Sequence, residues 1–160
     1  MLKQIFPLAT RRLVLRPLEA GDFAQFEKKM LEAARENPAH IPTNIETDFT
    51  DRLRQVVAFD QKFSIAAFDC RRTDRLVADL TFRPVDRTAK SLSVTYYTMQ
   101  RYRRLLMMTE ILQRVLPVLH DEYGVSAVHA VIEPDNRNSL KTAARLGFRP
   151  EGRNVYVYKC

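Results

Sequence analysis

Glycine is scarce in this chain, which has only four in 160 residues. No stretch has the glycine and serine content of a flexible linker, and no low-complexity tract or internal repeat divides the chain. We therefore expect a single domain over residues 1–160, a length that can bury a sizeable hydrophobic core. The four glycines are Gly21, Gly124, Gly147 and Gly152.

Cysteine and long apolar runs are also rare. The two cysteines, Cys70 and Cys160, form no C-x-x-C pair and have no histidines at metal-ligand spacing, so we expect neither a bound metal nor a disulfide framework. No apolar run approaches the roughly 20 residues that span a bilayer. Residues 1–7 are too short and too interrupted for a secretory signal. We expect a cytoplasmic protein without a membrane segment.

Positive charge is in excess, with a formal net charge of +7. Such a balance favours anionic partners, which include nucleic acid, a phosphorylated cofactor and acidic substrates. The basic residues form small separate groups and no continuous tract. Charge alone therefore does not choose among these partners, and nucleic acid has no other support in the sequence.

The periodicity of apolar residues predicts an α/β (α+β) fold. Short alternating segments indicate strands, and segments with an apolar stripe at a spacing of three or four residues indicate helices. Thr50 is the predicted N-cap of the second helix, and Pro117 lies inside the third. This order of elements fits a mixed central sheet with helices on both faces. The predicted strands are 10–17, 62–68, 75–84, 92–99, 126–132 and 154–158, and the predicted helices are 20–34, 50–59, 103–123 and 137–146.

Two motifs near the ends of the chain carry a family resemblance. The run D-N-R-N-S-L at 135–140 is followed by A-A-R-L-G-F-R-P-E-G at 143–152, and the chain opens with T-R-R-L-V-L-R-P-L at 10–18. Together they resemble the GNAT acetyltransferases, in particular the branch that acetylates the N-termini of ribosomal proteins. With the strand order between them, the resemblance covers nearly the whole chain and implies acetyl-CoA as co-substrate.

The resemblance also implies where the cofactor arm lies. Strands 92–99 and 126–132 would separate around the pantetheine, whose amides would pair with the backbone of Tyr97, Thr98 and Met99. Asn136 would hold the arm, and Ser139 would protonate the departing thiolate. By their chemistry, Tyr97 and also Tyr96 and Tyr158 could donate a proton, although tyrosines in such strands more often pack in the core or line a groove. From the residues alone, Asn136 and Ser139 could equally serve only to cap a helix. Residues 92–96 contain no acidic side chain, so the sequence identifies no general base.

The phosphate loop departs from the family pattern. Aligning residues 102–110 with Y-R-G-x-G-x-A-T-E places Arg104 and Leu106 where glycines would let phosphates approach the backbone. In one interpretation, the arginines of this segment still bind the anion; in the other, Arg104, Leu105 and Leu106 fill the cleft. Leu105 also belongs to the predicted apolar stripe of the helix. The residues predicted to contact the phosphates are Arg101, Arg103, Arg104, Leu105, Leu106, Met107, Met108 and Thr109.

The sequence is compatible with two functions. The first is an N-acetyltransferase that moves an acetyl group from acetyl-CoA to a primary amine, either a protein N-terminus or a small molecule. The alternative is a catalytically silent GNAT-like module that binds a protein or a nucleic acid. The oligomeric state is expected to be a monomer or a homodimer, the latter through an exposed face of Leu106, Met107 and Ile111.

Overall fold

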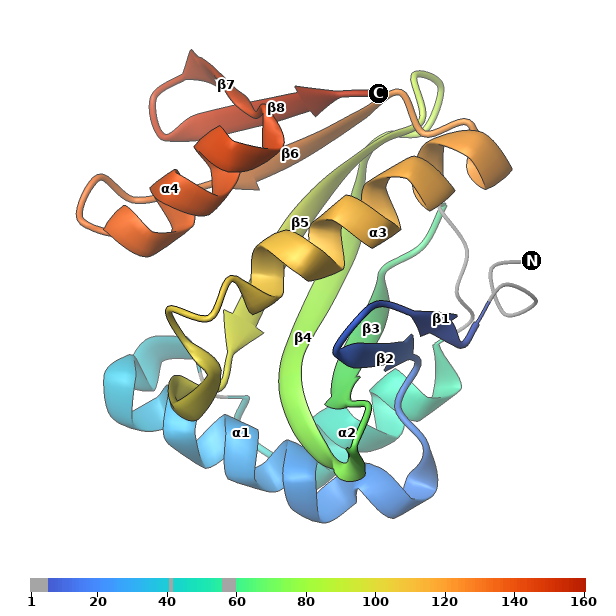
Figure 1. Ribbon diagram of the computed structural model, residues 1–160, viewed down its shortest axis with the longest axis vertical. Helices are drawn as coiled ribbons and strands as arrows, with labels where there is room; N and C mark the ends of the chain where they lie inside the picture. Colours follow the sequence, from blue (N-terminus) through green and yellow to red (C-terminus); the bar gives the residue numbers. More distant parts are fainter. Residues whose placement is uncertain (1–5, 41, 56–59) are drawn as a thin grey trace.

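The computed structural model describes residues 6–40, 42–55 and 60–160 and contains one eight-stranded sheet (Figure 1). The spatial order of strands is β1-β2-β3-β4-β5-β6-β8-β7. Neighbouring strands are antiparallel except β5 and β6, which are parallel. The strands are β1 (Leu8–Ala9), β2 (Leu13–Arg16), β3 (Phe63–Asp69), β4 (Arg72–Asp86), β5 (Ser91–Thr98), β6 (Ala127–Val131), β7 (Arg149–Gly152) and β8 (Val155–Lys159).

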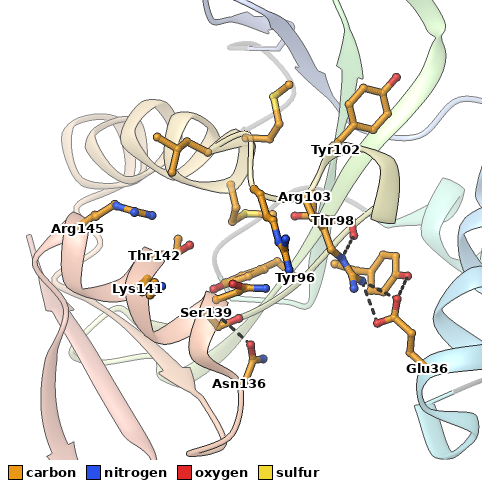
Figure 2. Close-up of a pocket in the computed structure, with 16 residues that line it drawn as sticks. Glu36, Tyr96, Thr98, Tyr102, Arg103, Asn136, Ser139, Lys141, Thr142 and Arg145 are labelled. Carbon is orange, nitrogen blue, oxygen red and sulfur yellow. Dashed lines mark hydrogen bonds and ion pairs between the residues drawn. The ribbon is translucent and has the colours of Figure 1, made fainter.

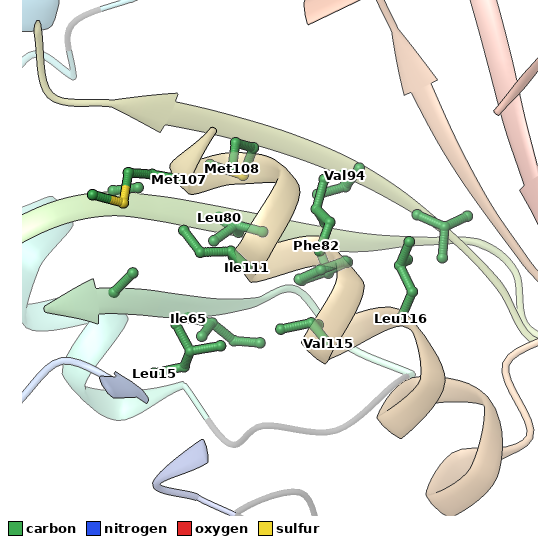
Figure 3. Close-up of a cluster of buried hydrophobic side chains, with 14 of the residues drawn as sticks. Leu15, Ile65, Leu80, Phe82, Val94, Met107, Met108, Ile111, Val115 and Leu116 are labelled. Atoms are coloured by element: carbon green, nitrogen blue, oxygen red, sulfur yellow. The ribbon is translucent and has the colours of Figure 1, made fainter. Parts of the chain in front are cut away.

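Helices cover both faces of this sheet, as predicted. The β3 side chains show this directly, because neighbouring residues of a strand point to opposite faces. Ile65 packs in one buried cluster with α3, and Ala66 packs in a second cluster with α1 and α2. Figure 3 shows Ile111 and Val115 of α3 lying over the strands in the first cluster. The α-helices are α1 (Phe23–Glu36), α2 (Ile45–Arg54), α3 (Met107–Tyr123) and α4 (Arg137–Leu146).

The predicted order of elements is confirmed, with two short strands added. The periodicity of apolar residues did not predict β1, which has only two residues, or β7, whose residues are all exposed. Leu76 and Ala78 of β4 do not share a face, although simple alternation along the predicted strand 75–84 would place them together. The β3–β4 register shifts between Ala67 and Phe68, and this bulge moves Leu76 into the cluster under α1 and α2.

The prediction for the second helix is wrong at its start. α2 begins at Ile45 and its N-cap is Asn44, whose side chain accepts a hydrogen bond from the backbone N–H of Thr47 at 3.0 Å. Thr50 therefore lies inside the helix. The last predicted residues, 56–59, lie outside the described residues.

The third helix begins four residues later than predicted. A 3₁₀ turn at Gln100–Tyr102 comes first, and α3 starts only at Met107. Leu105 is 47% exposed, so its predicted place in the buried stripe is wrong. The proposed exposed face is also wrong, because Met107 and Ile111 are buried. No helix among the described residues is long and apolar enough to span a bilayer.

Candidate active site

The parallel strands at the centre of the sheet separate and leave a cleft. β5 and β6 are paired only from Ser91 and Ala127 to Ser93 and His129, and the rest of β5 has no β6 partner. Beyond this point, the end of β5, the segment before α3 and the first turns of α4 enclose a cleft of about 630 Å³ (Figure 2). The stretch from Tyr96 to Met108 and the distant helix α4 thus contribute to one site.

The segment before α3 has a left-handed backbone at two residues that are not glycine. Arg104 has a φ of 61° and Leu106 has a φ of 59°, and these are the two positions where the family pattern has glycine. Residues other than glycine rarely adopt this conformation, since Cβ then crowds the backbone at a cost of about 1–2 kcal/mol each. The loop therefore has the backbone that glycines would favour, although it has no glycine.

This conformation keeps the N-terminus of α3 open. The first N–H groups of a helix have no acceptor within the helix, and they attract anions. Leu106 is the N-cap residue and its side chain is 51% exposed, and Leu105 does not line the cleft. Arg104 and Leu106 line a cleft that they do not close, which favours the interpretation in which this segment binds an anion.

Arg103 is engaged in contacts within the protein. Its guanidinium donates to the backbone carbonyl of Thr98 at 3.0 Å and to the carboxylate of Glu36 on α1 at 2.9 Å (Figure 2). Burial acts to raise the pKa of Glu36, but hydrogen bonds from Arg103 and Gln100 lower it below its usual value. Arg103 therefore connects the end of β5 to α1, and this pairing offsets its charge.

The hydroxyl of Tyr97 also turns toward α1. It donates to the carboxylates of Glu32 and Glu36, each at 3.1 Å. Burial and these two carboxylates raise the pKa of Tyr97 well above its usual value. Tyr97 therefore stays protonated, and its hydroxyl is held in place by hydrogen bonds to the two glutamates.

Ser139 lies beside a different tyrosine, Tyr96 (Figure 2). Burial raises the pKa of Tyr96, and a hydrogen bond with the Ser139 side chain partly opposes that rise. The sequence left Tyr96 as a proton donor or as a core or groove-lining residue, and in the structure it lines the cleft. Only the fold brings it to Ser139, because the two residues belong to β5 and α4.

Asn136 is the N-cap of α4. Its Oδ1 accepts a hydrogen bond from the backbone N–H of Ser139 at 3.2 Å, which is the capping role foreseen from the sequence. The same side chain also lines the cleft. Capping uses its carbonyl oxygen, and within the described residues its amide nitrogen donates to no protein group.

Besides the paired Arg103, three cationic side chains line the cleft, and they belong to two elements. Arg104 comes from the loop, and Lys141 and Arg145 come from one face of α4, where a spacing of four residues aligns them (Figure 2). All three residues are exposed. Sequence reasoning missed Lys141 and Arg145, although their spacing after Asn136 was a usable signal.

Most of the predicted site residues line the cleft. Four other predicted residues do not. Met99 is buried and its N–H donates to the carbonyl of Val77; Arg101 lies over the ring of Tyr102, 5.2 Å from its centroid. Leu105 and Thr109 also lie outside the lining, and the buried Oγ1 of Thr109 has no hydrogen-bond partner among the residues that the structure describes. Those that line the cleft are Tyr97, Thr98, Arg103, Arg104, Leu106, Met107, Met108, Asn136 and Ser139.

The fold and the cleft define an α/β protein with a site suited to a ligand that carries anionic groups. A family model for the acetyltransferase (GNAT) domain matches residues 12–149. This chain therefore belongs to the GNAT acetyltransferase family, as the sequence motifs predicted. No curated protein matches the chain.

Solved structures show the same fold. The chain resembles ribosomal-protein-S5-alanine acetyltransferase from Vibrio fischeri, with a TM-score of 0.80, 14% identity and 95% of each chain covered. It resembles RimL, a ribosomal L7/L12 α-N-protein acetyltransferase in complex with coenzyme A, with a TM-score of 0.80, 14% identity and 96% and 97% of the chains covered. A GNAT-family acetyltransferase from Bacillus anthracis has a TM-score of 0.79, 14% identity and coverage of 95% and 97%.

Proposed function

We propose that this chain, as one domain over residues 1–160, is an N-acetyltransferase that uses acetyl-CoA. The acceptor is a primary amine, at a protein N-terminus or on a small molecule. The observation that carries this proposal is the left-handed conformation of Arg104 and Leu106. A left-handed backbone at residues other than glycine costs free energy, and such strain is typically kept at functional sites. Its presence beside an open helix N-terminus therefore supports a cleft that still binds its ligand.

The residues of the cleft fit the charges of acyl-CoA. The first-turn N–H groups of α3 suit its pyrophosphate. The cations Arg104, Lys141 and Arg145 would bind the same phosphates or the phosphate on the ribose. The free amide nitrogen of Asn136 would donate to a carbonyl of the pantetheine arm.

The chemistry needs positioning and one proton transfer. The amine nitrogen attacks the thioester carbonyl, the carbon–sulfur bond breaks, and the amine loses one proton while the sulfur gains one. The hydroxyl of Ser139 would donate a proton to the sulfur and regain one from the amine through solvent. Tyr96 would orient Ser139 and retain its own proton, in keeping with its raised pKa. Holding both reactants in the cleft supplies much of the rate.

Calorimetric titration with acetyl-CoA tests the proposal. We expect micromolar binding that weakens at higher salt. Replacing Lys141 and Arg145 together by glutamine should raise the dissociation constant by about tenfold or more, since each tenfold change is about 1.4 kcal/mol. Arg114→Gln is the matched control, because Arg114 is an exposed arginine of α3 outside the cleft lining.

The outcomes separate the two functions. If millimolar acetyl-CoA gives no heat change, the proposed acetyltransferase function is rejected and the catalytically silent module is favoured. In that case, binding of an oligonucleotide that weakens steeply with salt would identify a nucleic-acid partner. Micromolar binding would justify screening amines, with peptides that carry a free N-terminus tested against small amines.

A further inference from the structure

The segment before β2 contacts the first turn of α3 through one carboxylate. Glu110 accepts a hydrogen bond from the hydroxyl of Thr10 at 2.6 Å, from Nε of Arg12 at 2.7 Å and from the backbone N–H of Arg12 at 3.0 Å. Burial acts to raise the pKa of Glu110, but these hydrogen bonds lower it below its usual value. The carboxylate is therefore ionised and fixed, and it holds the guanidinium of Arg12 in one place.

The other end of that guanidinium reaches the phosphate loop. Nη2 of Arg12 donates to the backbone carbonyl of Leu105 at 2.8 Å. Leu105 lies between the two left-handed residues, Arg104 and Leu106. Its carbonyl belongs to the peptide that joins it to Leu106, so a change of backbone conformation at Leu106 would turn that carbonyl away from Arg12.

We propose that Arg12 is a positioning residue that keeps the loop left-handed and so takes over the task that glycines perform in a glycine-rich loop. This inference rests on the proposed function, because the aligned N–H groups of α3 matter only if a phosphate binds there. Arg12 does not line the cleft, so it acts through the loop and not by contact with the ligand. Arginine suits this position because its rigid guanidinium places two separate nitrogens, Nε on Glu110 and Nη2 on the Leu105 carbonyl, whereas a lysine carries all its donors on one nitrogen.

The test combines a conservative variant with a glycine. Arg12→Lys keeps the charge for Glu110 but loses the contact with Leu105, and we expect the dissociation constant for coenzyme A to rise about tenfold or more. Adding Leu106→Gly should restore most of that affinity, because glycine adopts the left-handed conformation without penalty. Adding Leu106→Ala is the matched control: it removes the same side chain, keeps Cβ, and should restore nothing.

A second measurement needs no ligand. The backbone N–H of Glu110 donates to the carbonyl of Leu106 at 3.0 Å, so its exchange with solvent reports on the first turn of α3. We expect its exchange, followed by NMR, to accelerate in Arg12→Lys and to recover with Leu106→Gly but not with Leu106→Ala. If the intact chain fails to bind coenzyme A while this pattern holds, the proposed function fails and the role of Arg12 stands.

Two results would overturn the inference. One is an Arg12→Lys variant with unchanged exchange at Glu110. The other is recovery by Leu106→Ala as complete as that by Leu106→Gly, because the effect would then come from the leucine side chain and not from the backbone.

Discussion

Asp79 of β4 holds two cations beneath the first two helices, and replacing it with asparagine should severely destabilise the protein. Its carboxylate accepts a hydrogen bond from Lys29 of α1 and from Arg52 of α2, each at 2.8 Å. Lys29 is only 3% exposed and Asp79 only 6%. Asparagine has the same shape but no charge, so the substitution leaves two cations facing each other away from water.

The size of the effect follows from this burial. Removing one partner of a buried ion pair costs about 3–5 kcal/mol, out of the roughly 5–15 kcal/mol that stabilises a typical protein. At this chain length 1 kcal/mol shifts the melting temperature by about 2–4 °C, so we expect Asp79→Asn to lower it by about 6–20 °C. Urea unfolding at pH 7 gives the free energy directly.

Lys29→Met provides the internal control. Asp79 then still has Arg52 as a partner, so this variant should lose less stability than Asp79→Asn. In the double variant Arg52 still pairs with Asp48 at 3.0 Å, and no lone lysine remains. The double variant should therefore be more stable than Asp79→Asn alone, and the double-mutant cycle measures the coupling.

The pH dependence has a defined sign. Burial acts to raise the pKa of Asp79, but Lys29 and Arg52 lower it below its usual value. A carboxylate with a lowered pKa contributes stability above its unfolded-state pKa of about 3.9 and loses it as the pH falls through the folded-state pKa. The difference in the free energy of unfolding between the unmodified protein and Asp79→Asn should therefore become smaller as the pH falls into the acid range. A loss below about 1 kcal/mol at pH 7 would refute this reasoning, as would a difference that widens in acid.

Further predictions concern the helix ends and the cleft. Gly147→Ala should lower the free energy of unfolding by about 1–2 kcal/mol, because φ is 87° there, whereas Gly21→Ala, which has open space and no positive φ, should change it little. Asn136→Ser retains a capping oxygen but loses the amide donor, so turnover should fall about tenfold with an unchanged melting temperature; a parallel loss of both would assign Asn136 to capping alone. Ser139→Ala should lower kcat by about a hundredfold. Tyr97→Phe should lower kcat less, since two glutamates hold that hydroxyl; the reverse order would make Tyr97 the proton donor.

The sequence by itself determined much of the fold, because its cues are local. Alternation of apolar residues predicted the buried Leu13 and Leu15 of β2. Gly124 and Gly147 end α3 and α4 with φ of 64° and 87°, as expected for left-handed caps. Asn136 caps α4, as its place before a helical pattern predicted. In each case the outcome depends on the backbone preferences of a few neighbouring residues.

Tertiary structure decided the state of the cleft, because contacts between distant residues override local preference. Local preference gives no reason for a left-handed Leu106, and the loop contacts Arg12, a residue 93 positions before Leu105. The same applies to Lys29 and Asp79, which are 50 positions apart. Considered alone, the arginines beside this helix N-terminus suggest an anion site, whereas the leucine in place of glycine suggests a filled cleft. Only the folded chain supplies the arginine and the carboxylate that hold this loop in its open form.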